Sequence, residues 1–106
     1  MKVLVFEDNL VWSARFLQSL RKLGHQPVVP KCAADWEGAD VAIVNLASDF
    51  FKAAEIVPVA KQQGIYVIAH AGHKESQLLD LGKQLDCDRV ASNSEVTYKL
   101  DQLLLK

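Results

Sequence analysis

Three short runs of consecutive apolar residues constrain the fold of this chain more than any other feature. They occupy residues 3–6, 41–44 and 66–69 and are rich in β-branched side chains. An unbroken apolar run, without the alternation of a strand that faces water on one side, indicates a strand buried on both faces, as in a parallel sheet. Weaker strand signals at residues 28–29 and 89–91 bring the predicted number of strands to five.

The first and last helices are predicted from apolar stripes with matching end signals. A stripe of Phe and Leu side chains spans residues 16–23, where Asp8 or Asn9 can cap the start of a helix and Gly24 its end. Near the C-terminus, Ser92 and Glu95 have the spacing of a capping box. We expect one final helix after this box, with its inner stripe running to residue 104.

The segments between the strands in the middle of the chain are less regular. A helix is expected at residues 74–85, where Gly82 would let it lie close to the sheet. Residues 49–63 also have a helical pattern, but they include Pro58, so we expect a kink or a helix that begins near Pro58. Only residues 30–39 connect the second and third strands, which predicts a shortened second helix.

Alternating strands and helices predict the α/β fold class, with an open parallel sheet covered on both faces. The 106 residues fit a single domain, residues 1–106, and half of them are apolar. A formal net charge of -1 provides no basic surface for nucleic acid.

Nothing in the sequence predicts export or membrane insertion. No apolar run approaches the roughly 18 residues of a membrane span. Glu7 and Asp8 interrupt the short apolar start, which therefore differs from a signal peptide. We expect a cytoplasmic chain with no membrane partner, in which Cys32 and Cys87 stay reduced.

Polar residues that follow the predicted strands are the candidates for chemistry, because ligands bind at the carboxyl ends of strands in open α/β sheets. Glu7 and Asp8 follow the first strand and suit a hard cation such as Mg²⁺. Alternatively, Asp8 caps the helix and Glu7 is solvated. Phosphate-binding loops place glycines here, and this loop has none.

Two histidines follow the fourth strand at His70 and His73. Near two carboxylates they could bind Zn²⁺ or act as a general base. Because they lie on a loop, their rings need not converge, and the alternative is one hydrogen-bonded histidine and one exposed histidine.

Residues 3–9, VLVFEDN, resemble the opening of the receiver domain of two-component response regulators, a hydrophobic strand followed by an acidic pair. Residues 40–46 resemble the third receiver strand, whose last position is the phospho-acceptor aspartate and here is Asn45. The resemblance covers nearly the whole chain. It implies a flavodoxin-like fold with strand order 2-1-3-4-5.

Three functional positions depart from the receiver pattern. Besides Asn45, His70 occupies the switch position of a serine or threonine, and residues 92–94, beginning with Ser92, offer no lysine. The chain is similar in three features to a group of short stand-alone receiver-like bacterial proteins. These features are the shortened second helix, the Ala-Gly-His segment that ends at His73, and the Asp-Arg-Val-Ala-Ser sequence at residues 88–92.

These departures predict a chain that is not phosphorylated. Acyl phosphate formation needs a carboxylate nucleophile, and the amide of Asn45 is not one. We expect a non-catalytic pseudo-receiver that acts in signal transduction by protein binding, with no cofactor except weakly bound Mg²⁺ at Glu7 and Asp8. Asn45 can still donate a hydrogen bond to either acid. The alternative is a small metal-dependent enzyme that uses Glu7, Asp8 and His70.

A homodimer is the expected form of protein binding. Trp36 lies in the shortened second connection and is expected to cover sheet surface that a full helix would shield, with apolar surface left open beside it. Tyr98 and Leu105 lie seven residues apart, on a face of the final helix that its inner stripe does not use. Receivers are similar in dimerising through their last helix and strand.

Overall fold

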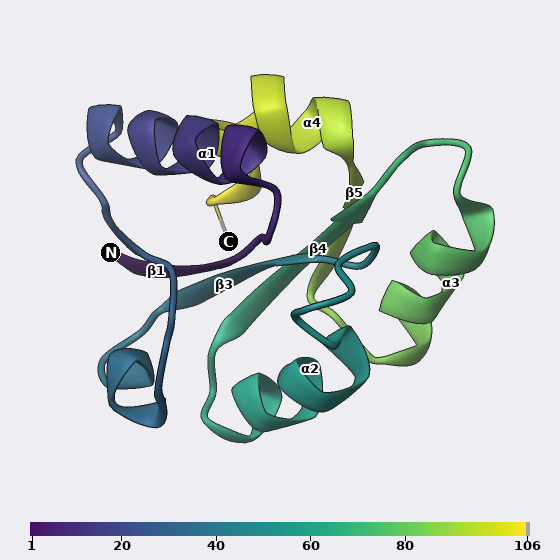
Figure 1. The fold of residues 1–106 in the computed structure, drawn as a ribbon, viewed down its shortest axis with the longest axis horizontal. Helices are drawn as coiled ribbons and strands as arrows, with labels where there is room; N and C mark the ends of the chain where they lie inside the picture. Colours follow the sequence, from purple (N-terminus) through teal and green to yellow (C-terminus); the bar gives the residue numbers. More distant parts are fainter. Residues whose placement is uncertain (106) are drawn as a thin grey trace.

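A computed structural model describes residues 1–105 as five strands alternating with helices (Figure 1). The strands are β1 (Lys2–Phe6), β2 (Gln26–Val28), β3 (Val41–Asn45), β4 (Tyr66–Ala71) and β5 (Arg89–Ser92). The helices are α1 (Leu10–Lys22), the 3₁₀ turn η1 (Ala33–Trp36), α2 (Ala53–Gln62), α3 (Ser76–Gln84), α4 (Asn93–Tyr98) and α5 (Leu100–Leu103).

The five strands form one parallel sheet in the order β2-β1-β3-β4-β5, as predicted. The register places Asn45, the last residue of β3, beside His70 of β4. The carboxyl ends of the three central strands therefore meet at one edge of the sheet.

Alternate residues of each central strand pack into two separate cores, which explains the unbroken apolar runs. Val3 and Val5 face the core under α1, α4 and α5, whereas Leu4 and Phe6 face the core under α2 and α3. Figure 1 shows these two helix layers on opposite sides of the sheet. All four side chains are at most 2% exposed, so both faces are fully covered along β1.

The ends of α1 and the packing of α3 follow the sequence signals. Asn9 caps α1, since its Oδ1 accepts hydrogen bonds from the backbone N–H groups of Val11 and Trp12. Gly24 follows the helix with φ of +84°, a conformation that favours glycine. A Cβ atom at Gly82 would lie 3.1 Å from side-chain atoms of Leu46 and Val90, so the glycine does allow close packing of α3.

Of the two alternatives at Pro58, a kink or a helix that begins there, the second is wrong. Helix α2 begins at Ala53 and continues through Pro58 to Gln62. Proline lacks only its own N–H, so one hydrogen bond is missing, and Pro58 itself is exposed. Burial of Ala53, Val57 and Ala60 against the sheet offsets this loss.

The final helix is also different from the single helix that was expected. The capping box of Ser92 and Glu95 is confirmed, but the chain leaves helical geometry at Lys99 and divides into α4 and α5. The hydroxyl of Thr97 donates to the backbone oxygen of Asn93 at 2.8 Å, a bond type that often bends helices. Tyr98 therefore belongs to a different helix from the residues that precede Leu105.

The short connection after β2 contains only η1, close to the single turn expected. The ring of Trp36 packs edge-on against Phe6, with the ring centroids 5.2 Å apart. Trp36 thus covers part of the sheet surface, as predicted. Within residues 1–105, no helix is both long and apolar enough to span a membrane.

Candidate functional site

Four polar side chains converge where the central strands end. Glu7 directly follows β1, Asn45 ends β3, His70 lies one residue before the end of β4, and Asn93 opens α4 after β5. Glu7 and His70 are only 3% and 2% exposed, so the two central groups are withdrawn from bulk water.

Asn45 binds the carboxylate of Glu7 directly. Nδ2 of Asn45 donates to Oε2 of Glu7 at 2.8 Å, and the backbone N–H of Asn9 donates to the same oxygen at 3.3 Å. Oδ1 of Asn45 accepts from the backbone N–H of Ala47 at 2.9 Å. Because both ends of the amide are used, its orientation is fixed. The predicted bond from Asn45 to an acidic residue is confirmed, with Glu7 as the acceptor.

His70 lies across the site from Glu7 and forms a hydrogen bond with Asn93. Its Nδ1 lies 2.7 Å from Oδ1 of Asn93, and an amide oxygen only accepts, so Nδ1 carries the proton. The ring packs edge-on against Phe16, with centroids 5.5 Å apart. Burial lowers the pKa of His70, and the contacts with Asn93 and Glu7 oppose this only in part. The imidazole is therefore neutral at pH 7, with a lone pair on Nε2.

A small, partly enclosed cavity separates Glu7 from His70. It has a volume of about 30 Å³ and is also lined by Trp12, Phe16 and the two asparagines. Oε1 of Glu7 and Nε2 of His70 face each other across 3.9 Å. Both atoms are buried, and neither has a hydrogen-bond partner among the described residues.

The other predicted site residues lie outside this cluster. The Asp8 side chain is exposed and accepts a long, 3.4 Å hydrogen bond from the backbone N–H of Phe50. His73 is exposed, which matches the alternative of one bonded and one exposed histidine. Ser92 caps α4, with Oγ accepting from the backbone N–H of Glu95. Residues 1–105 contain no group of three His, Cys, Asp or Glu side chains placed to hold a metal ion.

Asn93 is the site residue that the sequence analysis missed. Ser92, the residue before it, was the candidate at this strand end, but the side chain of Ser92 forms the capping box with Glu95. Its place directly after the end of β5, at the same edge of the sheet as the other strand ends, is the signal that could have identified Asn93.

The fold resembles several solved receiver domains. At a TM-score of 0.70 and 15% identity, the receiver domain of a Francisella response regulator aligns over 96% of this chain and 94% of its own. The signal receiver domain of a modulated diguanylate cyclase from Desulfovibrio desulfuricans aligns at a TM-score of 0.74 and 18% identity, over 95% of this chain and 87% of its own. A signal receiver domain from Vibrio parahaemolyticus aligns at a TM-score of 0.74 and 14% identity, over 97% of this chain and 85% of its own.

The chain has the receiver fold. No family model matches the sequence, and no curated protein matches it. The likeness therefore lies in the path of the backbone, and it extends over nearly the full length of each receiver domain compared. Within this receiver fold, the shortened second connection has a visible consequence on the surface.

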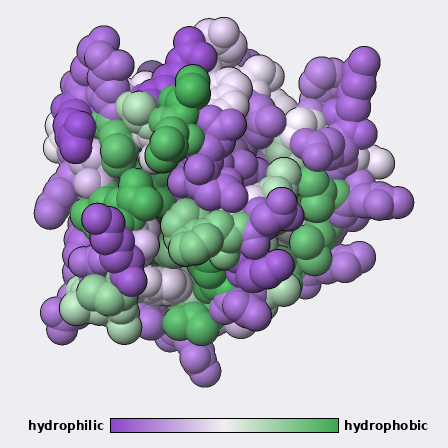
Figure 2. Space-filling view, viewed as in Figure 1, coloured by the Kyte–Doolittle hydropathy of each residue, from purple (hydrophilic) through white to green (hydrophobic). Residues whose placement is uncertain are grey.

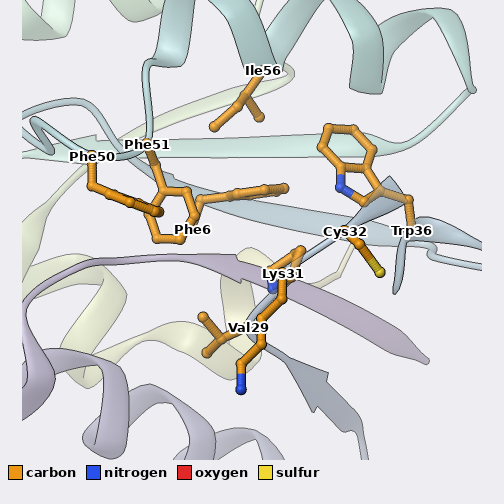
Figure 3. A pocket seen from close by; sticks show the side chains of 9 residues that line it. Phe6, Val29, Lys31, Cys32, Trp36, Phe50, Phe51 and Ile56 are labelled. Atoms are coloured by element: carbon orange, nitrogen blue, oxygen red, sulfur yellow. The ribbon is translucent and has the colours of Figure 1, made fainter. Parts of the chain in front are cut away.

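An open apolar groove of about 460 Å³ lies beside the short connection that carries η1. Figure 3 shows Phe50 and Phe51 on one side of it and Trp36 on the other, with the ring of Phe6 between them. Phe50 is 75% exposed. Figure 2 shows apolar side chains gathered across the middle of one face of the molecule, between polar ones. Trp36 covers the sheet, but apolar surface remains open next to it.

Proposed function

We propose that this chain is a receiver-like signalling module that is not phosphorylated and acts by binding a protein partner. The observation that carries the proposal is the 2.8 Å hydrogen bond from Asn45 to Glu7. An amide at the end of β3 offers no nucleophilic carboxylate, and here its nitrogen is already committed as a donor.

The surroundings of Asn45 support the same proposal. Phosphate bound at this edge would need a cation to offset its charge. The segment at residues 92–94 supplies Ser92, which caps α4, and Asn93, which binds His70. Glu7 would add negative charge on the other side. A phosphoryl group would therefore meet a buried carboxylate without a compensating lysine from this segment.

The binding role rests on apolar side chains that the fold leaves exposed. Tyr98 and Leu105 are 76% and 74% exposed, near the C-terminal end of the chain. The break at Lys99 removes the argument that they share one helical face, but both remain free to contact a partner. The groove beside Trp36, with Phe50 at its edge, is the other candidate surface.

We propose that the partner includes a second copy of this chain, since a two-fold dimer needs only one self-complementary patch. Sedimentation equilibrium over a dilution series should show a dimer at micromolar concentration. A Tyr98→Glu and Leu105→Glu double variant should be monomeric, whereas Phe50→Glu serves as the matched control on the groove. A wild type that stays monomeric at high concentration would exclude the dimer. Dissociation only by Phe50→Glu would move the interface to the Trp36 side.

A partner other than a second copy is tested in the native cells. The tagged full-length chain should co-purify with a signalling protein in near-stoichiometric amount. One of the two surface variants, the Tyr98→Glu and Leu105→Glu double variant or Phe50→Glu, should fail to recover this partner. The same variant should also fail to bind the purified partner. Equal recovery with all surface variants would contradict the binding proposal.

The metal-dependent enzyme remains the second candidate, because the fold does place Glu7 and His70 side by side. Against it, Asp8 lies on the surface and Oε2 of Glu7 is occupied by Asn45. We expect Mg²⁺ to bind no more tightly than in the millimolar range, on the order of 4 kcal/mol. Submicromolar binding of Mg²⁺ or Zn²⁺ in calorimetry, lost in a Glu7→Gln and Asp8→Asn double variant, would favour the enzyme.

A further inference from the structure

The small cavity between Glu7 and His70 poses a hydrogen-bonding problem that the described side chains leave unsolved. Oε1 of Glu7 and Nε2 of neutral His70 are both acceptors, since the proton of the imidazole is on Nδ1. They lie 3.9 Å apart and are inaccessible to bulk solvent. Two buried acceptors facing each other without a donor are costly, because each has given up its bonds to water.

The occupant that resolves this must supply two donors and must be small. A volume of about 30 Å³ accommodates one solvent-sized particle. A water molecule has two hydrogens and can donate one to each acceptor. A metal ion would find only these two orphaned ligand atoms among the described residues, whereas a typical zinc site supplies about four ligands.

We propose that this cavity is a built binding site for one water molecule, which donates hydrogen bonds to Oε1 of Glu7 and to Nε2 of His70. The separation of 3.9 Å is shorter than two hydrogen bonds laid end to end, so the water lies to one side of the line between the atoms. The apolar walls formed by Trp12 and Phe16 then hold it in place.

This water completes a continuous chain of hydrogen bonds across the sheet edge. Asn45 donates to Glu7, the water donates to Glu7 and to His70, and His70 donates to Asn93. Every donor in the chain meets an acceptor. The chain links the last residue of β3 to the first residue of α4.

A high-resolution crystal structure of the full-length wild type tests the site. We expect one spherical density peak within hydrogen-bonding distance of both Oε1 of Glu7 and Nε2 of His70. Two-bond ¹H–¹⁵N correlations of the imidazole should show the neutral Nδ1–H tautomer of His70 in solution. A direct Glu7–His70 bond with the Nε2–H tautomer would overturn the proposal. So would an anomalous-scattering peak at metal-ligand distance.

A double-mutant cycle tests whether the chain is continuous. Asn45→Ala and Asn93→Ala should be non-additive by more than about threefold in the unfolding equilibrium constant, because they interrupt one network. The matched control pairs Asn93→Ala with Ser48→Ala, which removes only a local bond to the backbone N–H of Phe51. That pair should be additive within about twofold. Additivity in both cycles would overturn the continuous chain.

Discussion

Replacing Asn45 by aspartate should reverse the sign of its interaction with Glu7. The wild-type amide donates to a carboxylate oxygen 2.8 Å away. In Asn45→Asp, a second carboxylate takes that position, so an attractive bond to a charged group, worth about 1.5–3 kcal/mol, is lost. Two unit charges at this distance repel by about 6 kcal/mol at an effective dielectric constant near 20.

Proton uptake limits this cost, because one of two carboxylates that share a site stays protonated to higher pH. Holding a proton on an ordinary carboxyl at pH 7.5 costs about 5 kcal/mol, and at pH 5 about 1.5 kcal/mol. With some side-chain relaxation, we expect Asn45→Asp to lose about 3–5 kcal/mol of unfolding free energy at pH 7.5 and about 1–2 kcal/mol at pH 5. The protonated form can donate to Glu7 as the amide does.

Urea unfolding, followed by circular dichroism at both pH values, measures this difference. Asn9→Asp is the matched control, because Asn9 caps α1 and aspartate is an equally good cap. The control should stay within about 0.5 kcal/mol of the wild type. A wild-type stability for Asn45→Asp at pH 7.5, or the same pH dependence in both variants, would refute the proposed role of the Asn45 bond.

Two further predictions concern residues outside the candidate site. Asp88→Ala should cost about 1–2 kcal/mol, because Asp88 accepts from Lys61 Nζ and from the backbone N–H of Val67 at a partly exposed site. Partial burial opposes the ionisation of Asp88, but these bonds outweigh it and lower the pKa of its carboxyl. Part of the wild-type unfolding free energy should therefore be present above the unfolded pKa of 3.8 and be lost as the pH falls below it. If urea unfolding between pH 5 and 2.5 shows the same loss of stability in Asp88→Ala, this prediction is contradicted. Burial raises the pKa of the Cys87 thiol to about 11, whereas Cys32 is exposed. Iodoacetamide at pH 8 should therefore alkylate Cys32 at least about tenfold faster than Cys87, as peptide mass mapping would show, and equal rates would be inconsistent with the burial of Cys87.

Much of the fold could be predicted from sequence because its strands are buried on both faces. The unbroken apolar runs, the capping residues Asn9 and Ser92, and Gly24 each have a local physical signature. Strand ends in a parallel sheet meet at one edge, and this alone brought Glu7, Asn45 and His70 together.

The rest depended on interactions between distant residues. Helix α2 begins before Pro58 because burial against the sheet outweighs one missing hydrogen bond. The break at Lys99 lies beside a side-chain bond of Thr97, a bond type that often bends helices and that no periodicity reveals. The partnership of His70 with Asn93 requires knowing which face of β4 the imidazole occupies.

The most direct test of the proposed function is a phosphorylation assay on the wild-type chain. The protein is incubated with acetyl phosphate and Mg²⁺ and then examined by intact mass spectrometry, with an active receiver domain as the positive control. We expect no phosphate adduct on the wild type, and little on Asn45→Asp, since residues 92–94 still supply no lysine. A stoichiometric phosphate adduct on the wild type would contradict the central claim.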